Sequence, residues 1–302
     1  MIGPDQLLCV FDNLPLKKYR VTAMLEGYRQ AFKELELTSQ KVLPITMLLL
    51  ANETSRRLIE GAGKYYALII GNNIHRHLTR LKTAEADAKS VAELLRESYG
   101  FETKLLLNAT REQILVALNE YRRKVSPGDN LLVYYAGHGH FDTDVERAYW
   151  LPTDARQEDN ANWVSADDIS ANIKGIPAKH SLIISDSCYS GSISRLLFLK
   201  TTVSSGRDRY LQTMLDGKSR TLLASGGNQP VADGGGSGHS VFARALLTGL
   251  SQMNQEIFTT RELYDNFIGE AVTSISKQAP EYSFIRSAGH ESGDFVFIRR
   301  RQ

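Results

Sequence analysis

SLIISDSCYSG, at residues 181–191, begins as an apolar run and ends in small, turn-forming residues. A short apolar run bounded in this way is typical of a buried strand that leads into a turn. Cys188 would then lie just beyond the carboxyl end of that strand. Open α/β sheets bind their ligands at this edge, so the stretch predicts both a fold class and a site.

A second stretch is built in the same way. DNLLVYYAGHGH, at residues 129–140, is an apolar run that leads into His138 between two glycines. Right-handed crossovers between parallel strands would place His138 and Cys188 at the same edge of one sheet. The two stretches together therefore predict a paired histidine and cysteine.

Strand patterns alternate with helix patterns from Lys64 onwards, and Thr110 with Gln113 forms a capping-box pattern. This alternation indicates an α/β fold, with a mostly parallel central sheet flanked by helices. Residues 204–209 and 234–238 are expected to be loops. We expect strands at residues 65–71, 101–107, 131–136, 149–151, 181–185, 221–225, 281–286 and 294–298, and helices at 83–99, 110–125, 164–173, 241–253 and 260–276.

Residues 1–63 differ from the rest, and we interpret them as an N-terminal helical extension or prodomain. Apolar side chains at residues 21, 25, 28, 32 and 35 recur at helical spacing, and a second helix is expected after Pro44. The segment either packs on the main domain or recruits a regulatory protein partner. Apolar stripes of this kind usually pack. The main domain would then span residues 64–302.

The composition is that of an ordinary globular protein, with 42% hydrophobic and 23% charged residues among 302. A net charge of +2 gives no reason to expect nucleic acid or an acidic membrane surface as a partner. The apolar run at residues 42–51 is shorter than the roughly 20 residues of a membrane span, and the start lacks the basic flank of a signal peptide. Cys9 and Cys188 make no disulfide framework, so a cytoplasmic location is expected. The cysteines and histidines show no zinc-ligand spacing.

Cys188 and His138 together predict acyl transfer by a thiol. A thiol with the usual pKa of about 8.5 is mostly protonated at neutral pH, so it needs a neighbouring base. His138 could take that proton and return one to a leaving amine. The amides of Gly139 and Cys188 are candidates for stabilising an oxyanion, by about 3 kcal/mol per donor. The alternative is an inert, buried cysteine; the position of both groups at strand ends favours catalysis.

Two short boxes carry a resemblance to a known family. YYAGHG at residues 134–139 and DSCYSG at residues 186–191 resemble the histidine and cysteine boxes of metacaspases and of prokaryotic caspase-like peptidases. His138 and Cys188 are 50 residues apart, and caspases show a spacing of about 50. The resemblance covers roughly residues 64–300. It implies a caspase-type α/β sandwich and a cysteine endopeptidase with a Cys–His dyad acting on proteins or peptides.

The resemblance also implies how the chain divides. Residues 64–194 would correspond to the large subunit of a caspase, residues 195–218 to a linker, and residues 219–302 to the small subunit. The linker is rich in Arg and Lys, so an enzyme that cuts after basic residues could process itself there. The alternative is a solvated basic loop.

Substrate choice follows from charge, because a pocket for Arg or Lys needs carboxylates. Asp186, two residues before the cysteine, and Asp87, in the first turn of a helix, match the two pocket aspartates of metacaspases. The family's Gly-Cys-x-Asn-Asp pattern keeps only Asp87 here, and the serine two residues before the histidine is Ala136. We expect cleavage after Arg or Lys. The alternatives are a solvated Asp87 favoured by the helix dipole and an Asp186 that bonds turn amides.

Three further features keep alternatives open. Ser225 and the residues after it could hold an extended substrate as an added strand, or form a plain turn. An acidic loop at residues 142–146 makes calcium, which many metacaspases use, a candidate activator; it has no EF-hand spacing. The whole chain could instead be a caspase-fold signalling or scaffold module, whose residues 1–60 recruit partners. His140 and His239 have no assigned role.

Overall fold

The chain forms two units, residues Met1–Arg56 and Arg57–Gln302. The computed structural model describes residues 15, 17–23, 31–38, 45, 58–187, 206–226, 238–276 and 278–300. The second unit begins earlier than the predicted boundary at residue 63. The reason is that Leu58 and Ala62 are buried in the same apolar cluster as the main sheet.

The first unit contains a β-hairpin where the sequence predicted a helix. β1 (Lys18–Ala23) pairs with β2 (Ala31–Glu36) in antiparallel register, so the helical interpretation is wrong for the described residues 21–23 and 31–35. Along β1 the half-buried Tyr19 and Val21 alternate with exposed neighbours, which is the period of a strand. The predicted second helix lies mostly outside the described residues.

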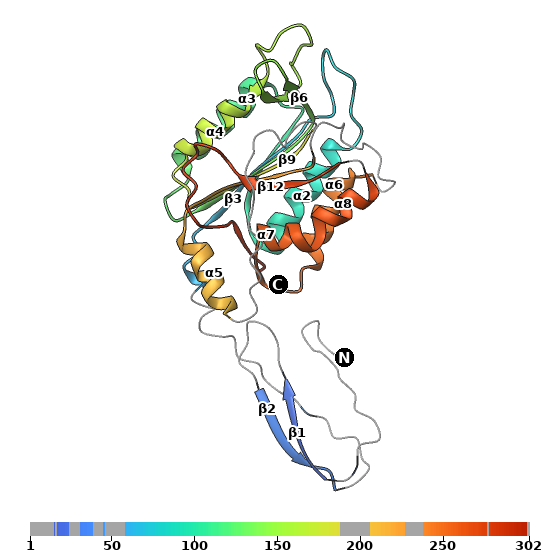
Figure 1. Ribbon diagram of the computed structural model, residues 1–302, viewed down its shortest axis with the longest axis vertical. Coiled ribbons are helices and arrows are strands. Elements are labelled where there is room, and N and C mark those ends of the chain that lie inside the picture. The colour runs from blue at the N-terminus through green and yellow to red at the C-terminus, as the bar shows by residue number, and fades with distance from the viewer. Residues whose placement is uncertain are drawn as a thin grey trace. The chain divides into compact units, whose positions relative to one another are not determined.

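The second unit is built on a six-stranded sheet with the order β12-β10-β9-β5-β3-β4 (Figure 1). Every neighbouring pair is parallel except β10 with β12. This confirms the predicted mostly parallel sheet. The strands are β3 (Tyr65–Gly71), β4 (Glu102–Leu107), β5 (Asn130–Ala136), β9 (His180–Asp186), β10 (Ser219–Ala224) and β12 (Glu281–Phe284).

Helices cover both faces of the sheet (Figure 1). α2 (Ala84–Tyr99), α6 (Val241–Gln252) and α8 (Gly269–Ile275) lie on one face, and α3 (Arg111–Lys124) and α4 (Ala166–Gly175) on the other. Successive side chains of a strand point to opposite faces. Ile69 of β3 accordingly packs in the α2 and α6 cluster, and its neighbours Leu68 and Ile70 pack in the α3 and α4 cluster.

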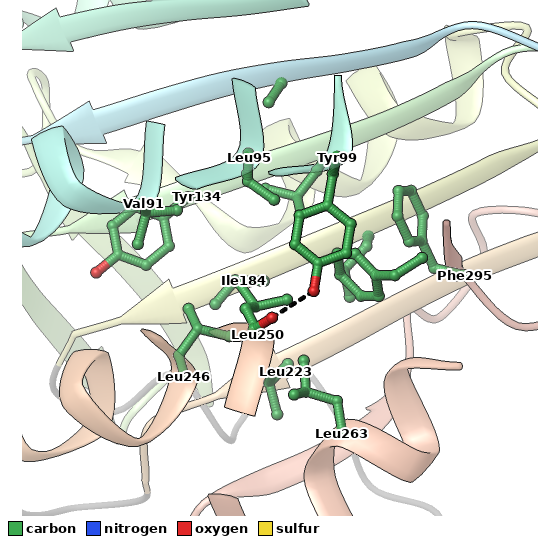
Figure 2. Close-up of a cluster of buried hydrophobic side chains, with 14 of the residues drawn as sticks. Val91, Leu95, Tyr99, Tyr134, Ile184, Leu223, Leu246, Leu250, Leu263 and Phe295 are labelled. Atoms are coloured by element: carbon green, nitrogen blue, oxygen red, sulfur yellow. Dashed lines mark hydrogen bonds between the residues drawn. The ribbon is translucent and has the colours of Figure 1, made fainter. Parts of the chain in front are cut away.

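The α2 and α6 cluster is the larger of the two apolar clusters, and Figure 2 shows part of it. Val91 and Leu95 of α2 and Leu246 and Leu250 of α6 belong to one buried cluster. It also contains the side chains of Tyr134 and Ile184 from the sheet. The Tyr99 hydroxyl donates a hydrogen bond of 2.5 Å to the Leu250 carbonyl, so this buried phenol keeps a partner. The central strands are thus fixed from both sides.

Two small sheets and two irregular helices complete the unit. β6 (His138–Asp142), β7 (Arg147–Leu151) and β8 (Val164–Ser165) form a three-stranded antiparallel sheet, and β11 (Ile257–Thr259) pairs with β13 (Val296–Ile298). The predicted helix at 260–276 is divided into α7 (Thr260–Leu263), a π-helical turn (Tyr264–Ile268) and α8. α5 (Arg207–Asp216) forms where a loop was predicted, because Leu211 is buried and Arg207 is held by other elements.

The acidic loop after β6 is a turn stabilised by its own carboxylate. Asp142 Oδ1 accepts hydrogen bonds from the amides of Asp144 and Val145, at 3.0 and 3.3 Å. Over the described residues there is no group of three His, Cys, Asp or Glu side chains that could hold a metal ion. Within the same residues, none of the helices combines the length and the apolar character that crossing a membrane requires.

Arg220, at the start of β10, is fully buried at the amino-terminal ends of the parallel strands. His138 lies at their opposite, carboxyl-terminal ends. Its guanidinium donates to the carbonyls of Lys179 and Ser219, at 3.2 and 2.7 Å, and to those of Ile176 and Ala178, at 3.3 and 2.8 Å. Burial lowers the pKa of Arg220 to about 10, so the group stays charged at neutral pH. It therefore joins the end of α4 to β9 and β10.

We predict that Arg220→Met lowers the free energy of unfolding by about 3 kcal/mol, because it leaves buried carbonyls without donors. Denaturation in urea measures the change. Arg123→Met, at an exposed position of α3, is the control and should change stability by no more than about 0.5 kcal/mol. Equal, small effects of both substitutions would show that the four carbonyl contacts do not stabilise the fold.

Candidate active site

The register of two central strands places the histidine box and the first residues of the cysteine box at one edge of the sheet. Ala136, the last residue of β5, lies opposite Asp186, the last residue of β9. The amide of Gly137 then donates to the Asp186 carbonyl at 3.3 Å. His138 follows Ala136 by two residues, just as Cys188 follows Asp186. Cys188 itself lies outside the described residues.

His138 is held by the loop between β3 and α2. Its Nε2 atom is 2.7 Å from the carbonyl oxygen of Thr79. A carbonyl can only accept, so Nε2 must carry a proton. In a neutral ring this leaves the lone pair on Nδ1, which is the arrangement a general base needs.

His75, from the same loop, packs against His138. The two rings meet edge to face with centroids 4.7 Å apart. His75 is buried, and its Nε2 donates to the Leu151 carbonyl at 3.2 Å. Burial, assisted by the nearby His138, lowers the pKa of His75 to about 4. His75 is therefore uncharged at neutral pH and does not oppose a positive charge on His138.

Tyr135 fixes the backbone that carries His138. Its ring stacks on Trp150 at 4.5 Å, and its hydroxyl lies 2.8 Å from the His138 carbonyl and 3.1 Å from that of Leu151. Gly137 makes this possible, because a Cβ there would lie 2.6 Å from the Tyr135 hydroxyl. Gly139, a predicted oxyanion donor, lies on β6 opposite Trp150.

Three buried serines surround the start of the cysteine box: Ser185 precedes it, Ser187 is its second residue, and Ser225 lies beside it, directly after β10. The Trp150 indole donates to Ser185 Oγ at 2.9 Å, and Ser185 Oγ lies 3.0 Å from Ser187 Oγ. Ser225 continues β10: its amide donates to the Ser185 carbonyl at 2.9 Å and its hydroxyl to that of Ser187 at 3.4 Å. Ser225 thus supports the end of β9, and its amide is already used by the sheet.

The two predicted pocket carboxylates are close together and buried. Asp87 is 1% exposed and Asp186 2% exposed, so the alternative of a solvated Asp87 is wrong. Ser240 contacts both: its hydroxyl donates to Asp186 Oδ2 at 2.5 Å and its amide to Asp87 Oδ2 at 3.3 Å. The Nδ1 atom of His239 lies 2.6 Å from Asp87 Oδ1. Burial raises the pKa of Asp87, and the bond to His239 acts against this.

Comparison with known proteins assigns the family. The family model for the caspase domain matches residues 64–287. The chain belongs to the caspase-domain family. The resemblance inferred from the two boxes is therefore confirmed, and the mostly parallel sheet with helices on both faces is the caspase fold.

The relatives of this caspase domain include fungal metacaspases. Metacaspase-1A of Neurospora crassa is 29% identical over 204 residues, which is 61% of this chain and 44% of the relative. Metacaspase-1A of Aspergillus fumigatus is 29% identical over 161 residues, 46% of this chain and 38% of the relative. The chain thus spans less than half the length of these curated relatives.

A solved structure from Geobacter sulfurreducens matches this caspase domain in fold. It superimposes with a TM-score of 0.51 at 21% identity, over 74% of this chain and 93% of that chain. At this identity the similarity concerns the fold alone.

Sequence reasoning missed several residues of the caspase-domain site. Thr79 and His75 come from a loop without periodicity. His239 and Ser240 come from the start of α6, 152 and 153 residues after Asp87. His75 and His239 can be read from the sequence, but the residues that they contact cannot. Their place in the sequence could have pointed to them: His75 and Thr79 follow the carboxyl end of strand β3, and His239 and Ser240 directly precede helix α6.

We predict that Gly137→Ala destabilises the caspase domain by about 1–3 kcal/mol, since the added methyl group must displace the buried Tyr135 ring. Thermal unfolding followed by circular dichroism measures this. The matched control is Gly128→Ala at an exposed turn, where a Cβ meets nothing within 4 Å. If Gly137→Ala unfolds at the temperature of the control, the close approach of Tyr135 does not constrain this position.

Proposed function

We propose that the chain is a cysteine endopeptidase in which His138 is the general base and Cys188 the nucleophile. The observation that carries the proposal is the pairing of Ala136 with Asp186. These residues end β5 and β9 at the same edge of the sheet, and His138 and Cys188 each follow one of them by two positions. The fungal relatives bear the name metacaspase, and this agrees with the proposal. The position of the Cys188 sulfur is a prediction.

The geometry around His138 suits this chemistry. Nδ1 of the neutral ring takes the thiol proton, and the thiolate attacks the carbonyl of the scissile peptide bond. The ring then gives the proton to the leaving amine, and water hydrolyses the acyl-enzyme with the ring again acting as base. The Thr79 carbonyl, 2.7 Å from Nε2, accepts a hydrogen bond from Nε2 and orients the ring, and His75 beside it is uncharged. The amides of Gly139 and Cys188 are the proposed oxyanion donors.

The same proposal gives the enzyme a preference for Arg or Lys at P1, the residue before the cut. Asp87 and Asp186 are two buried carboxylates that bond the same residue, Ser240. Two carboxylates in one neighbourhood favour the binding of a cation, and a guanidinium can bond two oxygens at once. Both side chains are almost fully buried, so the binding of a basic side chain must uncover part of them.

A peptide panel that varies only P1 tests the activity and the preference together. We expect cleavage after Arg and Lys, and loss of at least 10³-fold in kcat for Cys188→Ala and His138→Ala, because the proton-transfer pair is broken. Cys9→Ala is the matched control and should retain wild-type activity. Activity that persisted in Cys188→Ala would exclude the proposed nucleophile, and a preference for Asp at P1 would exclude the basic pocket.

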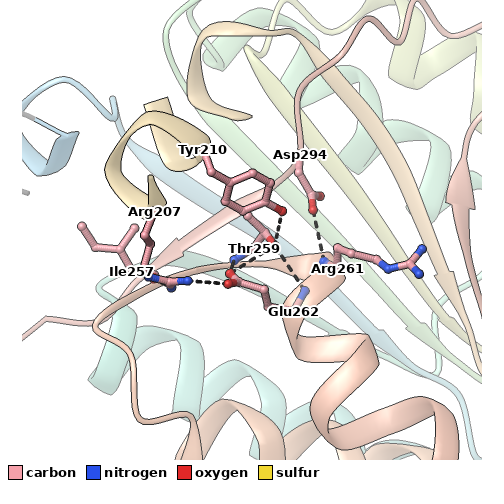
Figure 3. A network of polar contacts seen from close by, with 7 residues as sticks. All are labelled: Arg207, Tyr210, Ile257, Thr259, Arg261, Glu262 and Asp294. Carbon is pink, nitrogen blue, oxygen red and sulfur yellow. Dashed lines mark hydrogen bonds and ion pairs between the residues drawn. The ribbon is translucent and has the colours of Figure 1, made fainter. Parts of the chain in front are cut away.

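The elements around the linker restrict where self-processing can cut. Arg207 donates to Glu262 at 2.5 Å and to the Ile257 carbonyl at 2.7 Å, as Figure 3 shows. It begins α5, which also contains Arg209. A peptidase needs an extended chain, so cleavage within this helix would require it to unfold. Arg220 is fully buried in β10. Lys218, between α5 and β10, is bonded to Glu291 by both its amide and its carbonyl, at 3.1 and 2.9 Å. We therefore propose Arg195 and Lys200, which precede α5, as the processing sites.

We predict that the double variant Arg195→Gln, Lys200→Gln remains a single band on a denaturing gel when wild type has been cut. Arg209→Gln, in α5, is the control and should be processed as fast as wild type. N-terminal sequencing of the smaller fragment identifies the cut. A fragment that begins at residue 208 or 210 would contradict the protection by α5, and an intact, active wild type would exclude self-processing.

A further inference from the structure

His239 is a titratable side chain of the site that the proposed mechanism does not use. It lies directly before Ser240, the N-cap residue of α6, and its side chain is 26% exposed. Its Nδ1 lies 2.6 Å from Oδ1 of a carboxylate that is almost fully buried, that of Asp87. Of the two partners, the imidazole of His239 is the one that solvent reaches, and the carboxylate of Asp87 is buried.

The start of α6 holds Asp87 by both oxygens. His239 bonds Oδ1, and the amide of Ser240 bonds Oδ2 at 3.3 Å. The Ser240 hydroxyl bonds Asp186 at 2.5 Å and also accepts the amide of Ala243 at 2.8 Å, which caps the helix. Consecutive residues of one helix start thus orient both predicted pocket carboxylates.

We propose that His239 is a positioning residue that determines specificity, because its Nδ1–H holds Asp87 as an oriented and ionised acceptor for a basic P1 side chain. The inference rests on the proposed peptidase function. Each carboxylate oxygen can accept more than one hydrogen bond, so the bond from His239 leaves capacity for a substrate guanidinium or ammonium group.

The physical reason is the burial of Asp87. Burial raises the pKa of this carboxyl group, and the hydrogen bond from His239 is the largest of the effects that lower it. Other groups that face the pair are Asp186 from β9, through Ser240, and the buried hydroxyl of Tyr134 from β5, which interacts electrostatically with both carboxylates. Without the His239 donor, the pKa of Asp87 rises further. A protonated Asp87 has lost the charge that attracts a basic side chain.

The pKa of Asp87 determines how the KM for a P1-Arg peptide changes with pH. A carboxyl group with a higher pKa becomes protonated at a higher pH as the solution is acidified. The KM for a P1-Arg peptide should therefore rise on acidification at a higher pH in a variant without the His239 donor than in wild type. The value of kcat depends on His138 and Cys188 and should follow the wild-type profile.

The test compares two peptides that differ only in P1, one with Arg and one with citrulline, its uncharged isostere. For His239→Ala between pH 6 and pH 8, we expect a KM for the Arg peptide at least tenfold above wild type, and more at pH 6. The kcat should stay within twofold, and the KM for the citrulline peptide should not change. His239→Asn places an amide donor where Nδ1 was and should restore most of the affinity. His239→Phe keeps a ring without a donor and should behave like the alanine variant, even if the latter folds poorly.

Three results would overturn the role of His239. These are an equal rise in KM for both peptides, a fall in kcat with unchanged KM, or an asparagine variant as impaired as the phenylalanine variant. Carbon NMR of the Asp87 carboxyl gives a readout without substrate: its titration should move to higher pH in His239→Phe, and an unchanged titration would also overturn the inference. A wild type that does not distinguish Arg from citrulline would instead refute the proposed P1 preference, whatever the NMR titration shows.

Discussion

The parallel pairing of β5 with β9 is the constraint on which the rest of the second unit depends. Seven residues of each strand pair in register, and every one of them is buried. The centre of each strand is a continuous apolar run, at residues 131–136 of β5 and 182–184 of β9, as is typical of strands buried on both faces. A shift of one residue would exchange the two faces. Because the register is fixed by burial, the positions at which the two strands end are fixed too. The candidate site inherits its geometry from the core.

The two edges of the sheet carry different kinds of polar group. At the amino edge, Arg220 and His180 bond carbonyl and hydroxyl groups of neighbouring segments and are closed off from solvent. At the carboxyl edge, His138 and His239 are partly exposed and face carbonyl or carboxylate oxygens. Buried polar groups are costly unless they are bonded. The amino edge uses that bonding for cohesion, and the carboxyl edge uses it to orient side chains that solvent can reach.

Much of the second unit could be predicted from the sequence, because its elements have strong periodicity. The strand at 65–71, the helix capped by Thr110, and the position of the ends of β5 and β9 at one edge followed from apolar runs and from the handedness of crossovers. The antiparallel pairing of β1 with β2 was missed, since the apolar side chains of this region fit a helical period as well as an alternating one. α5 was missed because its sequence is polar and its position depends on distant contacts, such as that of Arg207 with Glu262. The contacts of Thr79 and His239 join segments 59 and 152 residues apart, and no local pattern encodes them.

The place of β10 in the sheet has a consequence for any nicked form of the chain. β10 lies between β9 and β12, and its residues are all buried. α6, which follows β10 in sequence, packs on α2. A break before α5 would thus leave two polypeptides that share one interior rather than two bodies that merely touch. Such fragments should migrate as a single species on gel filtration and come apart only when the protein unfolds. Separation would expose the apolar surface of the core that they share.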